Sequence, residues 1–294
     1  MQASDIIEVL TTLAWDGPYA ETDLAHAGDA LEQGKVLYLP HLPFQLLPSE
    51  DRFLTADVAG GNRKNVSFDP TRGALGGNKP GPDAADLAAM LNRFGTQAQQ
   101  LLCGLIPRYA PHLERARTSF RPVEVKGREQ TPRHDDRLLH VDAFPTRPMR
   151  GKRILRVFSN VAPDNSPREW RVAGDFAGYA QRFLPRIRTP LPGSAAFQAV
   201  IGLTKGKRSP YDTLMLGLHD QGKFDTDWQH TTDQVTIHFP AGTTWMCFTD
   251  SVLHAAMAGR CALEQTFHIP VAAMSHPELS PLHQLESLTN RPLI

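Results

Sequence analysis

Apolar positions repeat with a helical period in two parts of the N-terminal third. Residues 21–35 carry Leu24, Ala27 and Leu31 on one helical face, and Gly34 follows where such a helix would end. The longest such pattern lies further on and repeats in steps of three and four at Leu87, Leu91, Phe94, Ala98, Leu101 and Leu105. A stripe of this width is typical of a helix that packs on a core. We therefore predict two helices that serve packing.

Two non-helical segments lie in the same third of the chain. Residues 36–40, "VLYLP", are short and apolar, which predicts a buried strand. Residues 59–82 are rich in glycine, proline and asparagine, which predicts a long loop. Long loops in compact domains often act as lids or binding elements.

Strand-like stretches occur in two sets from about residue 118. The first set is "SFRPVEVK", "LLHVDAFP", "ILRVFSNVAP" and "REWRVAG", and the second is "DQVTIHF", "TTWMCFTD", "SVLHAAMAG" and "ALEQTFHIPVAA". Helical patterns separate the sets, in "DFAGYAQRFL", "AAFQAVIGL" and "YDTLMLGLHDQGKF". The strands lack the regular strand–helix alternation of a parallel sheet. The pattern favours an antiparallel sandwich or jelly roll, mainly β with helical additions.

These patterns predict one domain over 1–294. A helical and loop region is expected at 1–117, followed by a β core at 118–274. The core contains a helical insertion at 175–224, and a tail follows at 275–294.

Composition narrows the functional classes. Lysine plus arginine equals aspartate plus glutamate at 31 each, which argues against a general affinity for nucleic acid. The three cysteines, Cys103, Cys247 and Cys261, are far apart and predict reduced thiols in a cytoplasmic protein. The first residues lack the pattern of a signal peptide, and the apolar stretches are too short to span a bilayer.

Candidate chemistry lies in "LLHVDAFPTRP", residues 138–148. Side chains alternate faces along a strand, so His140 and Asp142 would point the same way, ~7 Å apart along the chain. A histidine and a carboxylate on an apolar strand need partners, because burying them alone is costly. A second His-x-Asp, His134 and Asp136, lies in a polar, turn-like segment where solvation satisfies both.

A third ligand is expected at His254. It follows a predicted turn near the end of a strand pair, and the small residues Ala255 and Ala256 leave room around a metal. The later histidines at 219, 230, 238 and 268 fit helix, loop or structural positions. Two histidines and one carboxylate make the facial triad of non-haem Fe(II) oxygenases.

Five segments resemble the Kdo hydroxylase family of Fe(II)/2-oxoglutarate-dependent dioxygenases: "GKVLYLPHLPF", "VSFDPTRGALGG", "LLHVDAFPTRP", "RILRVFSNVAP" and "SVLHAAMAGRCALEQTFHIP". The resemblance implies a double-stranded β-helix (jelly-roll, cupin-like) core with His140, Asp142 and His254 as iron ligands. It implies Fe(II), with 2-oxoglutarate and O2 as cosubstrates. The implied reaction is hydroxylation at carbon 3 of 3-deoxy-D-manno-oct-2-ulosonic acid (Kdo), in lipopolysaccharide or Kdo-lipid A.

The far carboxylate of 2-oxoglutarate needs a cation, for which arginine is best suited. The commonest superfamily pattern places a basic residue about ten positions after the last histidine, but "LEQTF" stands there in this chain. The remaining candidates are Arg156, with Asn160 on the same strand face, and Arg260. Gln265 and Thr266 are candidate hydrogen-bonding partners of the cosubstrate.

A basic stretch follows the His-x-Asp segment. Arg147, Arg150 and Arg153 are candidates for contact with the anionic groups of the substrate. Such a surface would also let a cytoplasmic enzyme touch the anionic inner membrane peripherally.

Two other interpretations stay open. In the first, the protein is an enzyme of the same class that acts on another small anionic substrate. A non-enzymatic jelly-roll sugar-binding module would use His140 and Asp142 structurally, and would hold no iron.

Overall fold

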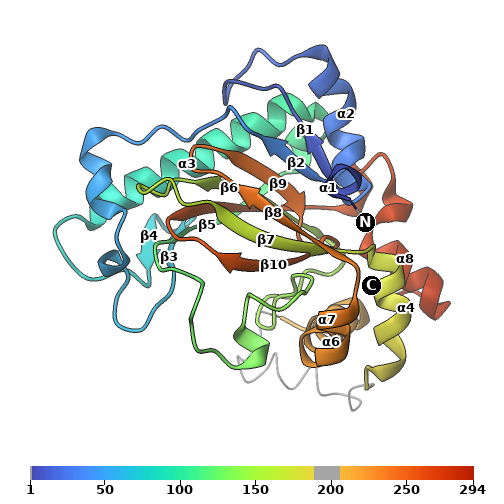
Figure 1. Cartoon of the computed structure of the whole chain (residues 1–294). Coiled ribbons are helices and arrows are strands. Elements are labelled where there is room, and N and C mark those ends of the chain that lie inside the picture. Colours follow the sequence, from blue (N-terminus) through green and yellow to red (C-terminus); the bar gives the residue numbers. More distant parts are fainter. Residues whose placement is uncertain (1, 189–205) are drawn as a thin grey trace.

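Two β-sheets face each other at the centre of the fold (Figure 1). The structure is a computed structural model, and it describes residues 2–188 and 206–294. The larger sheet has the strand order β1-β2-β9-β6-β11-β5-β3-β4, and the smaller has the order β10-β7-β8. In chain order the strands of the larger sheet are β1 (Ile7–Val9), β2 (Val36–Leu39), β3 (Val66–Asp69), β4 (Ala74–Gly76), β5 (Glu114–Arg121), β6 (Arg153–Asn160), β9 (Thr244–Phe248) and β11 (Ala262–Ile269). The smaller holds β7 (Arg168–Ala173), β8 (Gln234–Phe239) and β10 (Leu253–Ala258).

Helices cover the outer face of the larger sheet and one end of the sandwich. Helix α2 (Glu21–Glu32) packs on β2, and α3 (Ala84–Leu105) packs on β5 and β11. A second group lies at the lower right of Figure 1 and comprises α4 (Phe176–Phe183), α6 (Pro210–Phe224), α7 (Thr226–Thr231) and α8 (Pro281–Thr289). A short helix, α1 (Ala3–Ile6), precedes β1.

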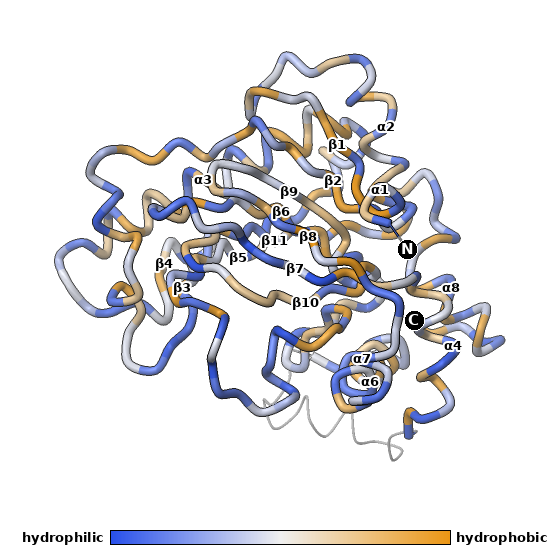
Figure 2. Tube along the Cα trace, viewed as in Figure 1, coloured by the Kyte–Doolittle hydropathy of each residue, from blue (hydrophilic) through white to orange (hydrophobic). Residues whose placement is uncertain are grey.

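Three apolar clusters hold these layers together. The first joins the outer face of the larger sheet to α3, through residues such as Phe94, Phe120 and Phe267. The second lies among the helices α4, α6, α7 and α8. The third fills part of the space between the sheets, where the Trp245 ring stacks on Phe158 at 5.3 Å between ring centroids. Figure 2 shows hydrophobic residues along β2, whereas β7, with its charged side chains, is largely hydrophilic.

Strand alternation sorts the side chains of β6 and β11 into two sets. Both strands are buried along their whole length. On β6, Leu155 and Val157 join the cluster under α3, so Arg156 and Phe158 point between the sheets. This alternation places charged side chains inside the sandwich.

Most predicted elements are confirmed. The expected helices match α2 and α3, and the two sets of strands match β5 to β7 and β8 to β11. The mainly β, jelly-roll class is also confirmed. Helices fill the expected insertion 175–224 within the described residues and continue through α7, whereas "AAFQAVIGL" (195–203) lies outside the described residues. That 1–294 forms a single domain stays a prediction.

Two expectations were wrong in part. The loop at 59–82 contains the hairpin β3–β4, because Val66 and Phe68 alternate into the core. The segment "LLHVDAFP" is not a strand, and it forms only one bridge, from His140 to His254. Within the described residues, no helix combines the length and apolar character needed to cross a membrane. All three cysteines are free thiols.

Candidate active site

Backbone hydrogen bonds hold the His-x-Asp segment against the end of β10. The His140 amide donates to the His254 carbonyl at 3.1 Å, and the His254 amide donates back at 3.0 Å. The Asp142 amide donates to the Thr249 carbonyl at 2.8 Å. Leu139 and Val141 are buried in the apolar cluster on the other side. The alternation expected of a strand therefore survives, and His140 and Asp142 point inward together.

The three predicted ligands converge. One ligand atom from each of His140, Asp142 and His254 lies within 4.8 Å of the others. Each imidazole donates its Nδ1–H to a backbone carbonyl two residues earlier, at 2.7 Å for His140 and 2.8 Å for His254. These bonds orient both rings and leave both Nε2 atoms for a metal. Among the described residues the buried Asp142 Oδ2 accepts no hydrogen bond of good geometry, although Arg156 Nη2 lies 3.1 Å from it. The donor set fits Fe(II).

The electrostatic surroundings hold these groups in ligating form. Burial lowers the pKa of both imidazoles, that of His140 well below its ordinary value, so both are neutral at pH 7. Burial alone would raise the pKa of Asp142, but Arg156 and other positive groups outweigh it, and the net pKa is lowered. Neutral imidazoles and an ionised carboxylate are the forms that bind divalent metals.

The triad lines a cavity of ≈190 Å³ between the sheets. Four cations and three carboxylates line it, namely Lys64, Arg121, Arg156, Arg168, Asp136, Asp142 and Glu264. Apolar walls come from β6, β7, β10 and β11, through Phe158, Trp170, Ala256 and Ala262. The Trp170 ring stacks on His254 with 5.1 Å between centroids. A divalent metal would make the cavity more positive, so it favours an anionic ligand.

Two cavity arginines are already paired with carboxylates. Arg156 contacts Asp142 at 3.1 Å and Glu264 at 3.0 Å. Arg121 contacts the same Glu264 at 2.7 Å. Glu264 therefore fixes both guanidinium groups, and Arg156 links this pair to the metal ligand Asp142. Arg156, the predicted cosubstrate cation, lies at the cavity, and its role in binding stays a prediction.

Arg168 also lines the cavity, but it differs from Arg156 and Arg121 because it has no carboxylate partner among the described residues. Its Nη1 donates to the Gly259 carbonyl at 2.7 Å, and within the described residues it has no carboxylate at ion-pair distance. It is 4 % exposed, and burial lowers its pKa to about 9. A buried, uncompensated guanidinium is costly unless an anionic ligand completes it. Sequence reasoning missed Arg168, although it alternates with Trp170 on one strand face, which was a usable signal.

Three predicted cosubstrate residues lie elsewhere. Arg260 is at the surface, where its Nη2 pairs with Asp164 at 2.9 Å. The Asn160 amide is consumed by backbone groups, including the Phe239 carbonyl at 3.0 Å. Gln265 lies on the α3 side of β11, where it bonds Thr118 at 2.5 Å. None of the three lines the cavity, so the structure contradicts their placement there.

Thr266 behaves differently from Gln265. It is the cross-strand neighbour of Arg156 and shares its inward face, but it does not line the cavity. A role for Thr266 with the cosubstrate stays a prediction.

The basic stretch divides into buried and exposed members. Arg153 is fully buried, pairs with Asp250 at 2.8 Å and lies over the Phe248 ring, so its expected substrate contact was wrong. Arg147 and Arg150 are exposed and do not line the cavity, and their contact with substrate stays a prediction.

The second His-x-Asp triplet was judged only half correctly. His134 is exposed, as expected. Asp136 instead lines the cavity, where its carboxylate accepts from Lys64 Nζ at 3.1 Å. The polar segment around Asp136 thus contributes to the cavity wall, and local sequence gave no sign of this.

Comparisons with known proteins agree with this geometry. A family described as 3-deoxy-D-manno-oct-2-ulosonic acid (Kdo) hydroxylase matches residues 14–292. A crystal structure of the Kdo hydroxylase KdoO, a non-haem Fe(II) α-ketoglutarate (2-oxoglutarate) dependent dioxygenase in complex with α-ketoglutarate and Fe(III), is 43% identical. The match covers 98% of this chain and 97% of that chain, with a TM-score of 0.94. KdoO in complex with cobalt(II) is 44% identical, with the same coverage and a TM-score of 0.95. No curated protein sequence matched.

Proposed function

This chain belongs to the Kdo hydroxylase family of non-haem Fe(II)/2-oxoglutarate-dependent dioxygenases, and from that premise we propose how its own residues act. The reaction converts a C–H of Kdo, O2 and 2-oxoglutarate into C–OH, succinate and CO2. We assign the hydroxylation to carbon 3 of Kdo in a lipid-linked acceptor such as Kdo-lipid A. His140, Asp142 and His254 are proposed to hold Fe(II).

Fe(II) bound at this triad supplies the redox chemistry that activates O2. The protein supplies orientation and exclusion of water. The two Nδ1–H···O=C bonds fix the imidazole planes, and Arg156 keeps Asp142 ionised. The apolar walls, including Trp170, Phe158 and Ala256, keep water from the reacting atoms.

Arg168 is proposed to bind the far carboxylate of 2-oxoglutarate, with Arg121 beside it. Both line the cavity, and they come from adjacent ends of β7 and β5 near the turn at Gly259. Arg121 already shares Glu264, whereas Arg168 lacks a carboxylate partner among the described residues. A carboxylate of the cosubstrate would form an ion pair with the Arg168 guanidinium and lower the free-energy cost of burying its charge.

The single observation that carries this proposal is the convergence of three ligand atoms within 4.8 Å beside the buried, uncompensated Arg168. A metal-free sugar-binding module has no use for either feature. The acceptor itself, its lipid-linked form and peripheral contact with an anionic membrane from the cytoplasmic side are part of the proposal.

The test measures succinate from purified enzyme supplied with Fe(II), 2-oxoglutarate and O2, with and without Kdo-lipid A. We expect succinate to rise with Kdo-lipid A and to vanish in His140→Ala. The matched control is His134→Ala, which removes the exposed histidine of the other His-x-Asp triplet and should retain full turnover.

Succinate formation that ignores Kdo-lipid A would keep the enzyme class and transfer the proposal to another anionic substrate. Absence of both turnover and bound metal in the wild type would leave the sugar-binding module as the better account.

A further inference from the structure

A second, larger groove adjoins the catalytic cavity. It has a volume of ≈910 Å³ and is lined from three segments that meet at the surface, by Ala56, Asp57, Ala59, Gly61, Asn62, Arg63, Lys64, Lys79, Val123, Arg128, Glu129 and Gln130. We call this the basic groove. Lys64 lines both spaces, and its Nζ contacts Gln130 of the groove at 2.9 Å and Asp136 of the cavity at 3.1 Å. The Lys64 side chain therefore borders both spaces.

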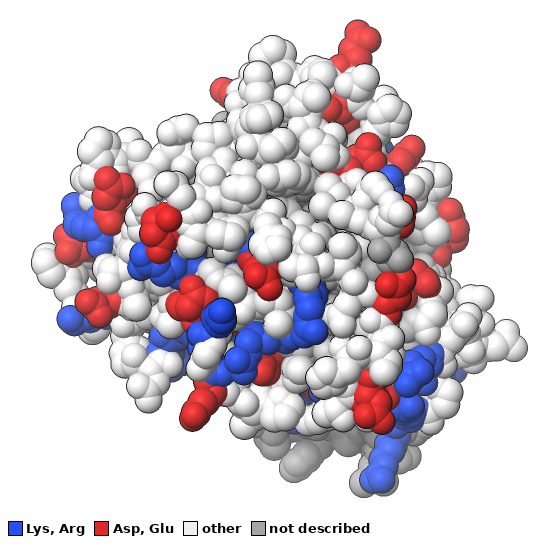
Figure 3. All heavy atoms as spheres, in the orientation of Figure 1, with Lys and Arg blue, Asp and Glu red and all other residues white. Residues whose placement is uncertain are grey.

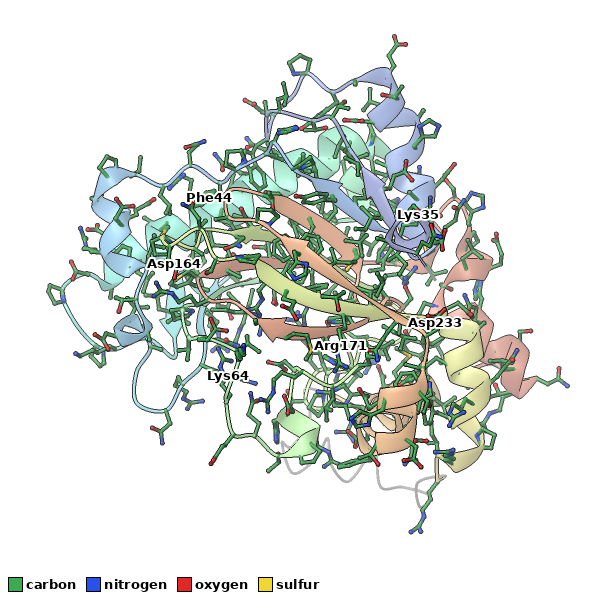
Figure 4. The ribbon with its side chains drawn as sticks, viewed as in Figure 1. Lys35, Phe44, Lys64, Asp164, Arg171 and Asp233 are labelled. Carbon is green, nitrogen blue, oxygen red and sulfur yellow. The ribbon has the colours of Figure 1, made fainter. Side chains whose placement is uncertain are left out.

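The basic groove has more cations than carboxylates in its lining. It carries four cations against two carboxylates, Asp57 and Glu129. Among the described residues, Arg63, Lys79 and Arg128 make no ion pair, and neither carboxylate approaches a cation at ion-pair distance. Figure 3 shows lysine and arginine side chains, with acidic side chains among them, across the middle of one face, and Figure 4 labels Lys64 on the same side of the molecule.

The walls of the groove are ordered by backbone pairing. The Gly60 amide donates to the Gly77 carbonyl at 2.9 Å, and the Lys79 amide donates to the Val58 carbonyl at 2.8 Å. A Cβ at Gly60 would lie 2.7 Å from the Asn78 carbonyl oxygen, so only glycine permits this approach. On the opposite wall, the Arg128 guanidinium donates to the carbonyls of Val123 and Glu124. The backbone of one wall and the Arg128 guanidinium of the other are therefore held in place.

Volume assigns the groove a part in substrate binding. The cavity at the triad, at ≈190 Å³, is below the ≈300–1,000 Å³ usual for sites that enclose a whole ligand. The cosubstrate and the reacting end of one sugar would fill it, so the rest of a glycolipid must lie outside. The cleft around Phe44 and Asn160, at ≈630 Å³, is lined by no lysine or arginine, so size alone does not produce the positive charge.

We propose that the basic groove binds a phosphate group of the glycolipid that carries Kdo, while Kdo itself enters the catalytic cavity past Lys64. Arg63, Lys79 and Arg128 are the phosphate contacts. This inference rests on the proposed function for the identity of the acceptor. It makes the enzyme selective for phosphorylated, lipid-linked Kdo over free Kdo.

The test compares Kdo-lipid A with the same acceptor after enzymatic dephosphorylation, both in uncharged detergent micelles. The variant is Arg63→Gln/Lys79→Gln, and the matched control is Arg182→Gln/Arg291→Gln, which removes equal charge from exposed sites on α4 and after α8. Anaerobic equilibrium binding is measured for each protein, and KM and kcat are measured aerobically.

We expect the groove variant to bind the phosphorylated acceptor about tenfold more weakly, with KM raised in parallel and kcat unchanged. Wild type should bind the dephosphorylated acceptor as weakly as the variant does, and the variant should lose nothing further on it. The control should match wild type throughout.

Equal losses for both acceptors, or for both double variants, would overturn the phosphate site. Unchanged acceptor affinity combined with lost binding to anionic phospholipid vesicles would overturn it in favour of a membrane-headgroup surface. The proposed function can fail separately. Phosphate-dependent binding without any succinate formation would refute the proposed hydroxylase activity and support the phosphate site in the basic groove.

Discussion

Replacing Arg168 with methionine isolates the cosubstrate anchor from the metal site. The Arg168 Nη1 is already used by the Gly259 carbonyl, so its remaining N–H groups are free for a carboxylate. Losing one charge-assisted hydrogen bond costs about 1.5–3 kcal/mol, and losing two costs about 3–6 kcal/mol. At about 1.4 kcal/mol per factor of ten, the Kd for 2-oxoglutarate should rise at least roughly tenfold for one bond and at least roughly 100-fold for two.

The same change should leave the ligand-free protein intact. Burial lowers the pKa of Arg168 to about 9, which means that the folded protein disfavours its charge at pH 7. Methionine removes that penalty, although the Gly259 carbonyl loses a donor. We therefore expect the ligand-free variant to melt within a few degrees of wild type, and 2-oxoglutarate to raise Tm only in wild type.

The assay is anaerobic calorimetric titration of 2-oxoglutarate into Co(II)-loaded protein, with melting curves in parallel. Arg168→Lys keeps the charge without the planar fork and should fall between the two. Unchanged 2-oxoglutarate affinity in Arg168→Met, with Co(II) still bound, would refute the assignment of the anchor.

Three further outcomes are expected. Ala256→Leu places a larger side chain in the cavity and should abolish 2-oxoglutarate binding while Co(II) still binds; normal cosubstrate affinity in calorimetry would contradict the cavity assignment. Arg260→Ala should leave kcat/KM unchanged and alter the unfolding free energy by less than about 0.5 kcal/mol, because its ion pair with Asp164 is at the surface. A large rise in KM for 2-oxoglutarate would instead place Arg260 in the cosubstrate site. Burial and, after it, the charge of Arg147 lower the pKa of His268 to about 4 in the folded protein. Between about pH 6.5 and pH 4 this imidazole is therefore protonated in the unfolded chain but neutral in the folded protein. Stability should therefore fall on acidification through that window, by up to about 1.4 kcal/mol per pH unit more than in His268→Asn, as urea unfolding would measure; parallel pH profiles for the two proteins would exclude this contribution.

The sequence predicts the elements of the fold well because their signals are local. The leucine stripe of α3 and the alternating strands are read from neighbouring residues. The loop at 59–82 misled because Val66 and Phe68, the core residues of a short strand, lie among many glycines. His140 and Asp142 were readable because alternation directs both inward, even though a single bridge replaces the strand.

The cosubstrate residues were harder because their roles depend on distant partners. Arg156 and Arg260 look alike in sequence, yet one lies between the sheets and the other pairs with Asp164 at the surface. Asp136 and Arg168 lie outside the predicted ligand set, and only the tertiary fold brings them to the cavity. Facing direction and long-range pairing decide these cases, and a local pattern reports neither.

The most direct test of the central claim is the mass of the sugar product. Kdo-lipid A is incubated with enzyme, Fe(II), 2-oxoglutarate and O2, and its Kdo is analysed by mass spectrometry with fragmentation that locates the change. The account predicts the gain of one oxygen atom at carbon 3, matched one-to-one by succinate and absent in His140→Ala. Succinate formed by iron-loaded wild type with no oxygen gained on Kdo would contradict it.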